Sequence, residues 1–216
     1  MIRRRYRFRT GRHLTFHPEL VDSAPNRTIL EASGFRRIAD GYQTIWLDLS
    51  LPPEALRAGL HQKWRNQLVQ AENNGLQLRI ERSADALAWL VERHEAHMSA
   101  RNYRGPSGRL LEAMRAHDTP TGTMRILRAF KGGEAVAGIL IVRHGKAATY
   151  FVGWNGPEGR KLRANHFLLW QATQQLREDG VDWFDLGGVN DAEALQVVRF
   201  KDDISQPRTT LVGGYT

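Results

Sequence analysis

The chain of 216 residues contains no cysteine and no apolar run of membrane-spanning length. The lack of cysteine excludes disulfides, thiolate metal sites and cysteine nucleophiles. Without a long apolar run, or the apolar core of a secretory signal at the N-terminus, we expect no membrane span and a cytoplasmic protein. Internal repeats and low-complexity linkers are also lacking, and the length suits one good-sized core or two small ones.

Acidic residues are fewer than basic ones, with 23 Asp and Glu against 31 Lys and Arg, and the net charge is +8. This balance favours polyanionic partners such as RNA, a nucleotide-linked substrate or an anionic membrane surface. A general basic bias of the proteome would give the same balance. Six arginines interleaved with aromatic residues precede residue 13, and they predict either an arm that lies on phosphates or a solvated terminus.

The periodicity of apolar residues predicts a chain of mixed helices and strands. Three strands joined by tight glycine turns predict an antiparallel meander. The expected strands are 43–49, 76–80, 123–130, 135–143, 147–154, 181–186 and 209–212. Caps and helical spacing predict helices at 27–33, at 53–73 as one continuous helix, after Ser83, at 107–117, at 162–177 and from residue 192.

Residues 181–201 are the stretch in which we expect chemistry. A short apolar strand ends at Gly187-Gly188, and Asn190 or Asp191 then caps a helix that ends in Phe200-Lys201. Ligands of α/β sheets usually lie beyond the carboxyl ends of the strands. A lysine there could stabilise an oxyanion or hold a phosphate. The alternative is one more solvated cation.

A metal site is not expected. His94 and His97 lie one helical turn apart, but a catalytic site needs a third ligand, and none has an evident place nearby.

Four motifs together resemble those of the Fem family, the aminoacyl-tRNA-dependent transferases that build peptidoglycan cross-bridges. FDLGGVN at 184–190 and RFK at 199–201 resemble the closing segment of that family. Lys63-Trp64-Arg65, with the segments at 70–72 and 75–76, resembles its K-x-R segment, and Thr149-Tyr150 with Gly153-Trp154 resembles its Y-x-x-G strand. The resemblance covers roughly residues 34–214, as order along the chain rather than close identity.

The resemblance implies an α/β (α+β) fold of the GNAT acyltransferase type, with a mixed, mostly antiparallel, twisted sheet flanked by helices. We expect residues 1–42 to form a basic arm and the remnant of a first GNAT-like domain, and residues 43–216 to form one GNAT-like domain. Family members commonly carry two such domains. A homodimer or a partner subunit would then replace the missing part, or the substrate is smaller.

The resemblance also implies a reaction that needs no cofactor. An amino acid would move from aminoacyl-tRNA to a primary amine of a cell-wall precursor or a small biosynthetic acceptor. Lys201 would stabilise the oxyanion, Phe200 would shape the pocket and Tyr150 would hydrogen-bond the substrate. The other residues expected to bind substrate are Arg101, or alternatively Arg104, on a phosphate, together with Trp154, Asp185 and Asn190. Asp185 could accept a proton or cap the turn that follows it.

The loop at residues 156–165 bears on the identity of the donor. Enzymes of this fold that use acyl-CoA hold the pyrophosphate on a glycine-rich turn. Here Pro157 lacks an N–H, Glu158 adds negative charge and no glycine stands at the point of close approach. The cations predicted to contact RNA are Arg160, Lys161, Arg163, Lys63 and Arg65, unless they are simply solvated.

Two other classes of function remain open. The chain could be an acyl-CoA-dependent N-acyltransferase, or a non-catalytic module that binds RNA or a partner protein.

Overall fold

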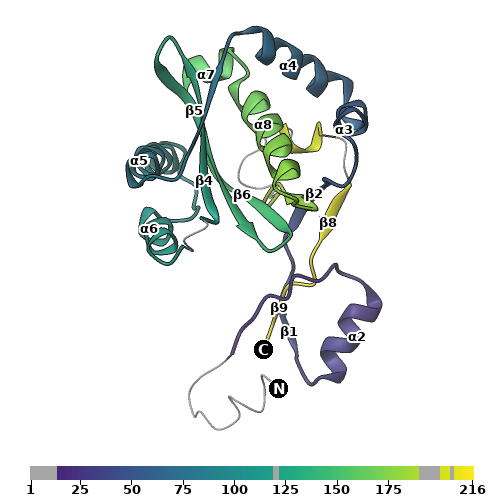
Figure 1. The fold of residues 1–216 in the computed structure, drawn as a ribbon. Helices are drawn as coiled ribbons and strands as arrows, with labels where there is room; N and C mark the ends of the chain where they lie inside the picture. Colours follow the sequence, from purple (N-terminus) through teal and green to yellow (C-terminus); the bar gives the residue numbers. More distant parts are fainter. Residues whose placement is uncertain (1–13, 119–121, 190–199, 205–206) are drawn as a thin grey trace.

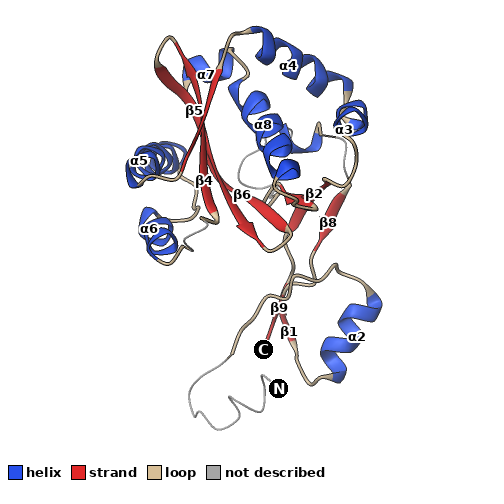
Figure 2. Cartoon of the chain, in the orientation of Figure 1, coloured by secondary structure: helices blue, strands red, loops and turns tan. Residues whose placement is uncertain are grey.

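The computed structural model describes residues 14–118, 122–189, 200–204 and 207–216. Within them, seven strands form one sheet in the order β3-β4-β5-β6-β7-β2-β8, and β1 pairs with β9 separately. Figure 1 shows a larger body around the seven-stranded sheet and a smaller module that holds α2, β1 and β9. Most strand pairs of the large sheet are antiparallel and helices flank it (Figure 2). The expected fold class is confirmed.

The centre of the large sheet is the predicted meander. Its strands are β4 (Met124–Lys131), β5 (Glu134–His144) and β6 (Ala147–Asn155), each antiparallel to the next. Gly145 has φ of +64°, a conformation open to glycine, and it allows the tight turn between β5 and β6. The remaining strands are β3 (Gln77–Glu81), β2 (Gln43–Asp48), β7 (Trp183–Asp185) and β8 (Arg208–Thr210).

The helices cover both faces of this sheet and bury a separate apolar cluster on each. On one face lie α3 (Pro53–Gly59), α4 (Gln62–Asn73) and α8 (Ala164–Glu178), and on the other lie α5 (Ala84–Arg101) and α6 (Gly108–Ala116). Strand β5 serves both clusters, because Ile139 and Ile141 point to the α8 face while Leu140 points to the α5 face. The short helix α7 (Pro157–Lys161) follows β6.

The single helix predicted over residues 53–73 is wrong, because the chain forms α3 and α4 with a break between them. Leu60 is extended, with ψ of 142°, directly after Gly59, a poor helix former. His61 then caps α4 through its ring, which accepts the Lys63 N–H at 3.3 Å. The Arg65 guanidinium donates to the carbonyl oxygens of Ala58 at 2.7 Å and Leu60 at 3.0 Å. It thus provides hydrogen-bond donors to carbonyl groups at the end of α3, where the helix itself provides none.

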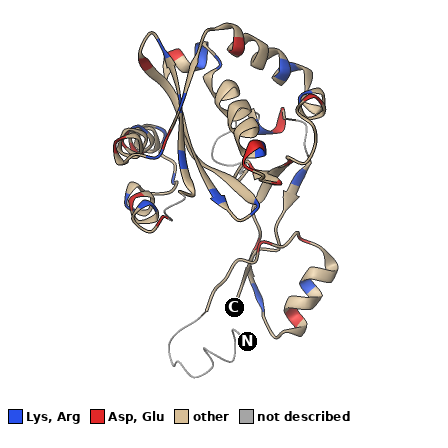
Figure 3. Ribbon diagram, viewed as in Figure 1, with Lys and Arg blue, Asp and Glu red and all other residues tan. Residues whose placement is uncertain are grey.

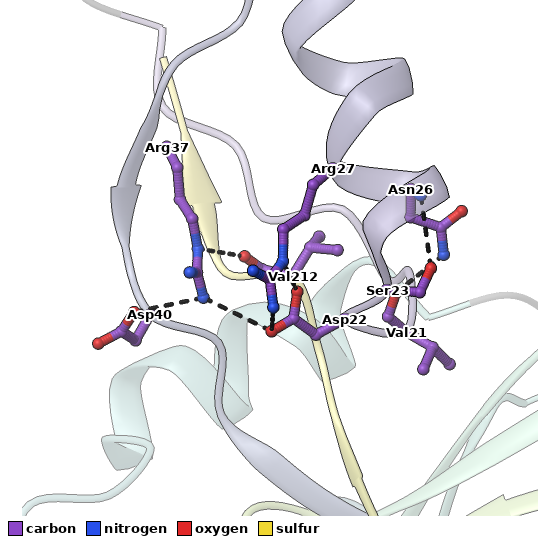
Figure 4. A network of polar contacts seen from close by, with 8 residues as sticks. All are labelled: Val21, Asp22, Ser23, Asn26, Arg27, Arg37, Asp40 and Val212. Atoms are coloured by element: carbon purple, nitrogen blue, oxygen red, sulfur yellow. Dashed lines mark hydrogen bonds and ion pairs between the residues drawn. The ribbon is translucent and has the colours of Figure 1, made fainter.

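The smaller module joins the two ends of the described chain. It contains α2 (Ala24–Ala32), β1 (Arg37–Ala39) and β9 (Gly214–Tyr215), around a core of Leu30, Val212 and Tyr215. Figure 4 shows its polar network, in which the carboxylate of Asp22 accepts from the guanidinium of Arg27 at 2.5 and 2.7 Å. Arg37 lies in the same network and donates to the Val212 carbonyl at 2.8 Å.

The pairing of the N-terminal segment with β9 bears on the expected domain boundary. Residues 211–216 pack with the N-terminal segment, so a boundary at residue 43 does not separate the two parts. That residues 1–42 are the remnant of a first GNAT-like domain stays a prediction.

Candidate active site

Strands β6 and β7 separate at the candidate site. They pair in parallel over only three positions, the last of which is Thr149 opposite Asp185. Strand β7 ends there, while β6 continues to Asn155. Gly187 has φ of +74°, and a Cβ at this position would lie 2.8 Å from the Tyr150 carbonyl oxygen. Glycine is therefore needed where the chain passes the backbone of β6 and turns away.

The turn after β7 is held by Asp185. Its Oδ1 accepts the Gly187 N–H at 2.8 Å and the hydroxyl of Thr44, which is buried on the neighbouring strand β2. This contact matches the turn-capping role considered for Asp185, whereas its role as a proton acceptor stays a prediction. Thr44 was not among the predicted residues, because its partner lies 141 positions away in the chain.

Lys201 lies against this turn with only 6% of its surface exposed. Its Nζ donates to the carbonyl oxygens of Gly188 at 2.9 Å and Gly187 at 3.2 Å. Nζ also lies 5.6 Å from the centre of the Tyr150 ring, within cation–π range. Of three N–H donors, one has no partner in the described part of the chain.

Burial lowers the pKa of Lys201 to about 8, an effect that the nearby Asp185 carboxylate opposes. At neutral pH most of the molecules therefore still carry an ammonium at this position. A cation with one spare donor is a group that can meet a developing negative charge.

Three rings from different segments pack together at Phe200, the residue before Lys201. Phe200 contacts His166 edge to face, with ring centres 4.9 Å apart, and lies 6.1 Å from Trp64. Trp64 and His166 are 5.0 Å apart. Burial lowers the pKa of His166 to about 4, so this ring is neutral at pH 7. Phe200 thus forms part of an apolar wall, and that this wall shapes a substrate pocket stays a prediction.

Trp64 and His166 were not predicted as site residues. Trp64 is 2% exposed, and its Nε1 has no hydrogen-bond partner among the described residues. The signal for Trp64 was its place between Lys63 and Arg65 in the K-x-R motif. No pattern along α8 singled out His166.

A β-bulge in β6 decides which side chains join the site. Ile141 pairs with Tyr150 and Leu140 pairs with Val152, so Phe151 is the extra residue. As a result Tyr150 packs on the α8 face with Lys201, while Val152 packs on the α5 face.

Trp154 also lies on the α5 face, so it does not join the site in which we expected it. Its ring packs edge to face on Trp89 of α5, with centres 5.5 Å apart. Regular alternation along β6 would have put Trp154 and Tyr150 on the same face, and the bulge reverses this. We therefore remove Trp154 from the candidate substrate-binding residues.

The spacing of Tyr150 and Gly153 has a steric basis. A Cβ at Gly153 would lie 2.1 Å from the Tyr150 hydroxyl, so the ring lies over a position that only glycine leaves open. Burial raises the pKa of Tyr150 to about 12, and its hydroxyl is therefore a hydrogen-bond donor at neutral pH.

Arg101 and Arg160, which are far apart in the sequence, come together near His97. Burial lowers the pKa of His97, and the charges of Arg101 and Arg160 lower it further. The His97 ring lies 3.2 Å from the hydroxyl of Tyr103, so the segment that follows α5 packs against His97 as well. Arg104 is exposed in the same segment.

The remaining predicted cations lie on the surface. Lys63 pairs with Asp203 at 3.1 Å, and Lys161 lies 3.4 Å from Glu158. Arg163 is exposed, with φ of +58° at the start of α8. Figure 3 shows blue and red segments interspersed along the ribbon of the body. Asn190 lies outside the described residues.

The loop before α8 is packed against the sheet. The Gly156 N–H donates to the Val136 carbonyl at 3.0 Å, and a Cβ at Gly159 would lie 2.4 Å from the same oxygen. Both glycines are thus used to bring α7 close to β5. Arg163 begins α8 without a side-chain cap.

Two further findings concern metals and membranes. No three His, Asp or Glu side chains of the described ranges gather where a metal ion could be held. Every helix in the part of the chain that the structure describes falls short of the length and apolar character needed to cross a membrane.

Comparisons with known proteins agree with this architecture. The model of the acetyltransferase (GNAT) domain family matches residues 58–202. The structure of FemX superposes with a TM-score of 0.80 at 13% identity, covering 94% of this chain and 71% of that one. The C-terminal domain of a putative lysylphosphatidylglycerol synthetase from Agrobacterium fabrum gives 0.61 at 17% identity, covering 95% and 68%. The sequence has no match among curated proteins. At these identities the likeness to solved structures concerns the fold, and the GNAT type predicted from the sequence is confirmed.

Proposed function

This chain belongs to the acetyltransferase (GNAT) domain family, and within that acyltransferase family we propose that it moves an amino acid from aminoacyl-tRNA to a primary amine. The acceptor would be an amine of a cell-wall precursor or of a small biosynthetic molecule. The work would be done in the cytoplasm, where charged tRNA is made. The proposed reaction needs no cofactor.

The buried ammonium of Lys201 is the observation that carries the proposal. The amine nitrogen attacks the ester carbonyl carbon, and the carbonyl oxygen becomes an oxyanion. When this intermediate collapses, the bond from carbon to the ribose oxygen breaks, and that oxygen leaves with the proton lost by the amine. Lys201 would donate its third N–H to the oxyanion.

The ester needs little further activation, so the enzyme mainly positions the two partners. The Tyr150 hydroxyl would hydrogen-bond the substrate beside Lys201. Phe200, backed by His166 and Trp64, would form the apolar wall of the acceptor side. Because Asp185 is engaged by Thr44 and by the turn, we assign no protein base.

Two features support tRNA rather than acyl-CoA as the donor. In the loop at residues 156–165 the Gly156 N–H is already bonded to the Val136 carbonyl of β5, and Gly159 packs closely on the same oxygen. The cations Arg101, Arg160, Lys161 and Arg163 are exposed around α7 and the end of α5, where they could contact phosphates. A second copy or a partner subunit would complete the groove for the RNA.

Acyl-CoA-dependent N-acylation is the second candidate. The first turn of α8 has no side-chain cap, so the N–H groups that precede His166, whose own N–H donates to the Arg163 carbonyl, would receive a pyrophosphate. A module that only binds RNA is the third possibility, since exposed cations need no chemistry.

The test is transfer from a mixture of charged tRNAs that carry labelled amino acids to a panel of primary amines. We expect labelled amide product that disappears when the tRNA is first digested with RNase. Transfer from acetyl-CoA alone, insensitive to RNase, would replace the proposal with the second candidate. Binding of tRNA without any product would favour the third.

A further inference from the structure

A cavity of about 230 Å³ lies on the α5 face of the sheet, away from the candidate active site. Its floor is apolar, because Leu87, Met124 and Ile126 line it and each is at most 4% exposed. The floor residues belong to the apolar cluster on the α5 face, whereas Tyr150, which lies beside Lys201, packs against the cluster on the α8 face. The cavity and the site near Lys201 therefore lie on opposite faces of the sheet.

Two arginines line the same cavity. Arg115 comes from the last turn of α6, and Arg82 lies between β3 and α5. The Arg115 Nε is buried and has no hydrogen-bond partner within the part of the chain that the structure describes. A buried guanidinium donor without a partner is costly, which makes it a strong attractor for an oxygen anion.

Gly122 and Asp118 complete the lining. Gly122 has φ of +68°, and a Cβ there would lie 3.1 Å from the Arg82 side chain, so glycine lets that arginine lie close. The Asp118 carboxylate accepts the backbone N–H groups of Thr123 at 2.7 Å and Met124 at 3.2 Å. Its negative charge is thus partly offset by the backbone, and two arginines line the same cavity.

We propose that this cavity binds a small organic oxyanion, a carboxylate or a phosphate monoester, whose apolar body is a few carbons long. The guanidinium groups of Arg115 and Arg82 pair with the anion, and the body contacts the floor of Leu87, Met124 and Ile126. The volume suits a small metabolite and is below that of sites for drug-sized ligands. The proposal does not depend on the reaction at Lys201.

Calorimetry with defined probes tests the site. Butyrate and propyl phosphate carry both parts of the proposed ligand, while acetate and inorganic phosphate carry only the head group. We expect butyrate to bind about tenfold more tightly than acetate, because two more methylene groups are buried. The comparison of butyrate with propyl phosphate shows which head group the site prefers.

Variants at the arginines decide whether the cavity is responsible. Arg115→Gln should weaken binding of the preferred probe about tenfold or more, since a charged hydrogen bond is lost. Arg82→Gln should weaken it less, because Arg82 is exposed. Arg109→Gln, also on α6 but not part of the cavity lining, is the matched control and should bind as the wild type does.

The stability of Arg115→Gln without a probe gives a second readout. Loss of a buried donor that lacks a partner should leave the melting temperature unchanged or raise it. If this variant fails to fold, Arg82→Gln decides by its binding alone. The proposal is overturned if neither butyrate nor propyl phosphate binds saturably, or if Arg115→Gln and Arg82→Gln bind both as tightly as Arg109→Gln does.

Discussion

The cations predicted to act in this protein fall into two regions that differ in their surroundings. Lys201 is buried, bonded to two carbonyl oxygens and placed beside Tyr150. The cationic surface, which we define as Arg101, Arg160, Lys161, Arg163 and Lys63, is exposed. A charge in water interacts weakly and is screened by salt, whereas a desolvated charge interacts strongly. We therefore expect Lys201 to govern turnover and the cationic surface to govern the salt dependence of binding.

The largest effect should come from Lys201→Met. Loss of one preorganised donor to an oxyanion typically costs about a hundred- to a thousand-fold in turnover. The affinity for tRNA should stay close to that of the wild type, because the charge acts on the intermediate. Rates of aminoacyl transfer and tRNA dissociation constants measure the two quantities. Lys146→Met, at a lysine whose side chain is 77% exposed, is the control and should be fully active. Equal activity of the two variants would remove Lys201 from the mechanism.

The pH dependence of stability tests whether Lys201 is buried as a cation. Its pKa of about 8 in the folded chain lies below its ordinary 10.5, so between these values the unfolded chain binds more protons. The free energy of unfolding should therefore rise with pH across this window, relative to Lys201→Met, by an amount on the order of 3 kcal/mol. Urea titrations of both proteins at several pH values measure it. Parallel pH profiles would mean that Lys201 titrates normally.

A contrast between the two faces of β6 should follow next in size. Trp154→Ala should lower the free energy of unfolding by about 2–3 kcal/mol, since Trp154 is packed on Trp89 but only partly buried. Turnover per folded molecule should persist. Tyr150→Phe should do the opposite, with stability within about 1 kcal/mol of the wild type and turnover reduced about tenfold. Thermal melts and rates distinguish the pair, and a loss of turnover in Trp154→Ala alone would reverse our assignment of the faces.

The cationic surface should act through salt. Replacing Arg160, Lys161 and Arg163 by glutamine should flatten the dependence of tRNA affinity on salt by about one unit of slope for each phosphate that is no longer neutralised. Turnover at saturating tRNA should hardly change. Filter binding over a range of salt concentrations gives the slope, and an unchanged slope would mean that these cations are merely solvated.

The smallest contrast lies within one motif. Arg65→Gln should cost about 1 kcal/mol of stability, because the guanidinium bonds two carbonyl oxygens at the end of α3. Lys63→Gln should cost less than about 0.5 kcal/mol, because its pair with Asp203 is exposed. Chemical unfolding of the two variants makes the comparison. A larger loss of stability in Lys63→Gln than in Arg65→Gln would show that the surface pair of Lys63 with Asp203 stabilises the fold.

The parts of the fold that follow from local pattern were predictable. The meander rests on alternation and glycine turns, and the placement of Lys201 beyond the end of β7 rests on a strand that ends at two glycines. Both depend on residues close together in the chain. The role of Phe200 in shaping the pocket came from the resemblance and stays a prediction; the structure shows its contacts with the rings of His166 and Trp64.

The parts that were missed depend on distant partners. The bulge at Phe151 shows only in the register between β5 and β6, so the sequence did not show that Trp154 and Tyr150 lie on opposite faces of β6. The pairing of residues 211–216 with the N-terminal segment depends on contacts across nearly the whole chain. The break at Leu60 is stabilised by Arg65, whose bonds to α3 were not visible in a pattern that continues through both helices.

The identity of the donor is the central claim, and one pair of titrations tests it most directly. The protein would be titrated in the same buffer with acetyl-CoA and with an aminoacyl-tRNA whose ester is replaced by a stable amide. We predict that the tRNA analogue binds with a dissociation constant on the micromolar scale or below, and that acetyl-CoA binds far more weakly or not at all. Micromolar binding of acetyl-CoA, without binding of the tRNA analogue, would contradict the account.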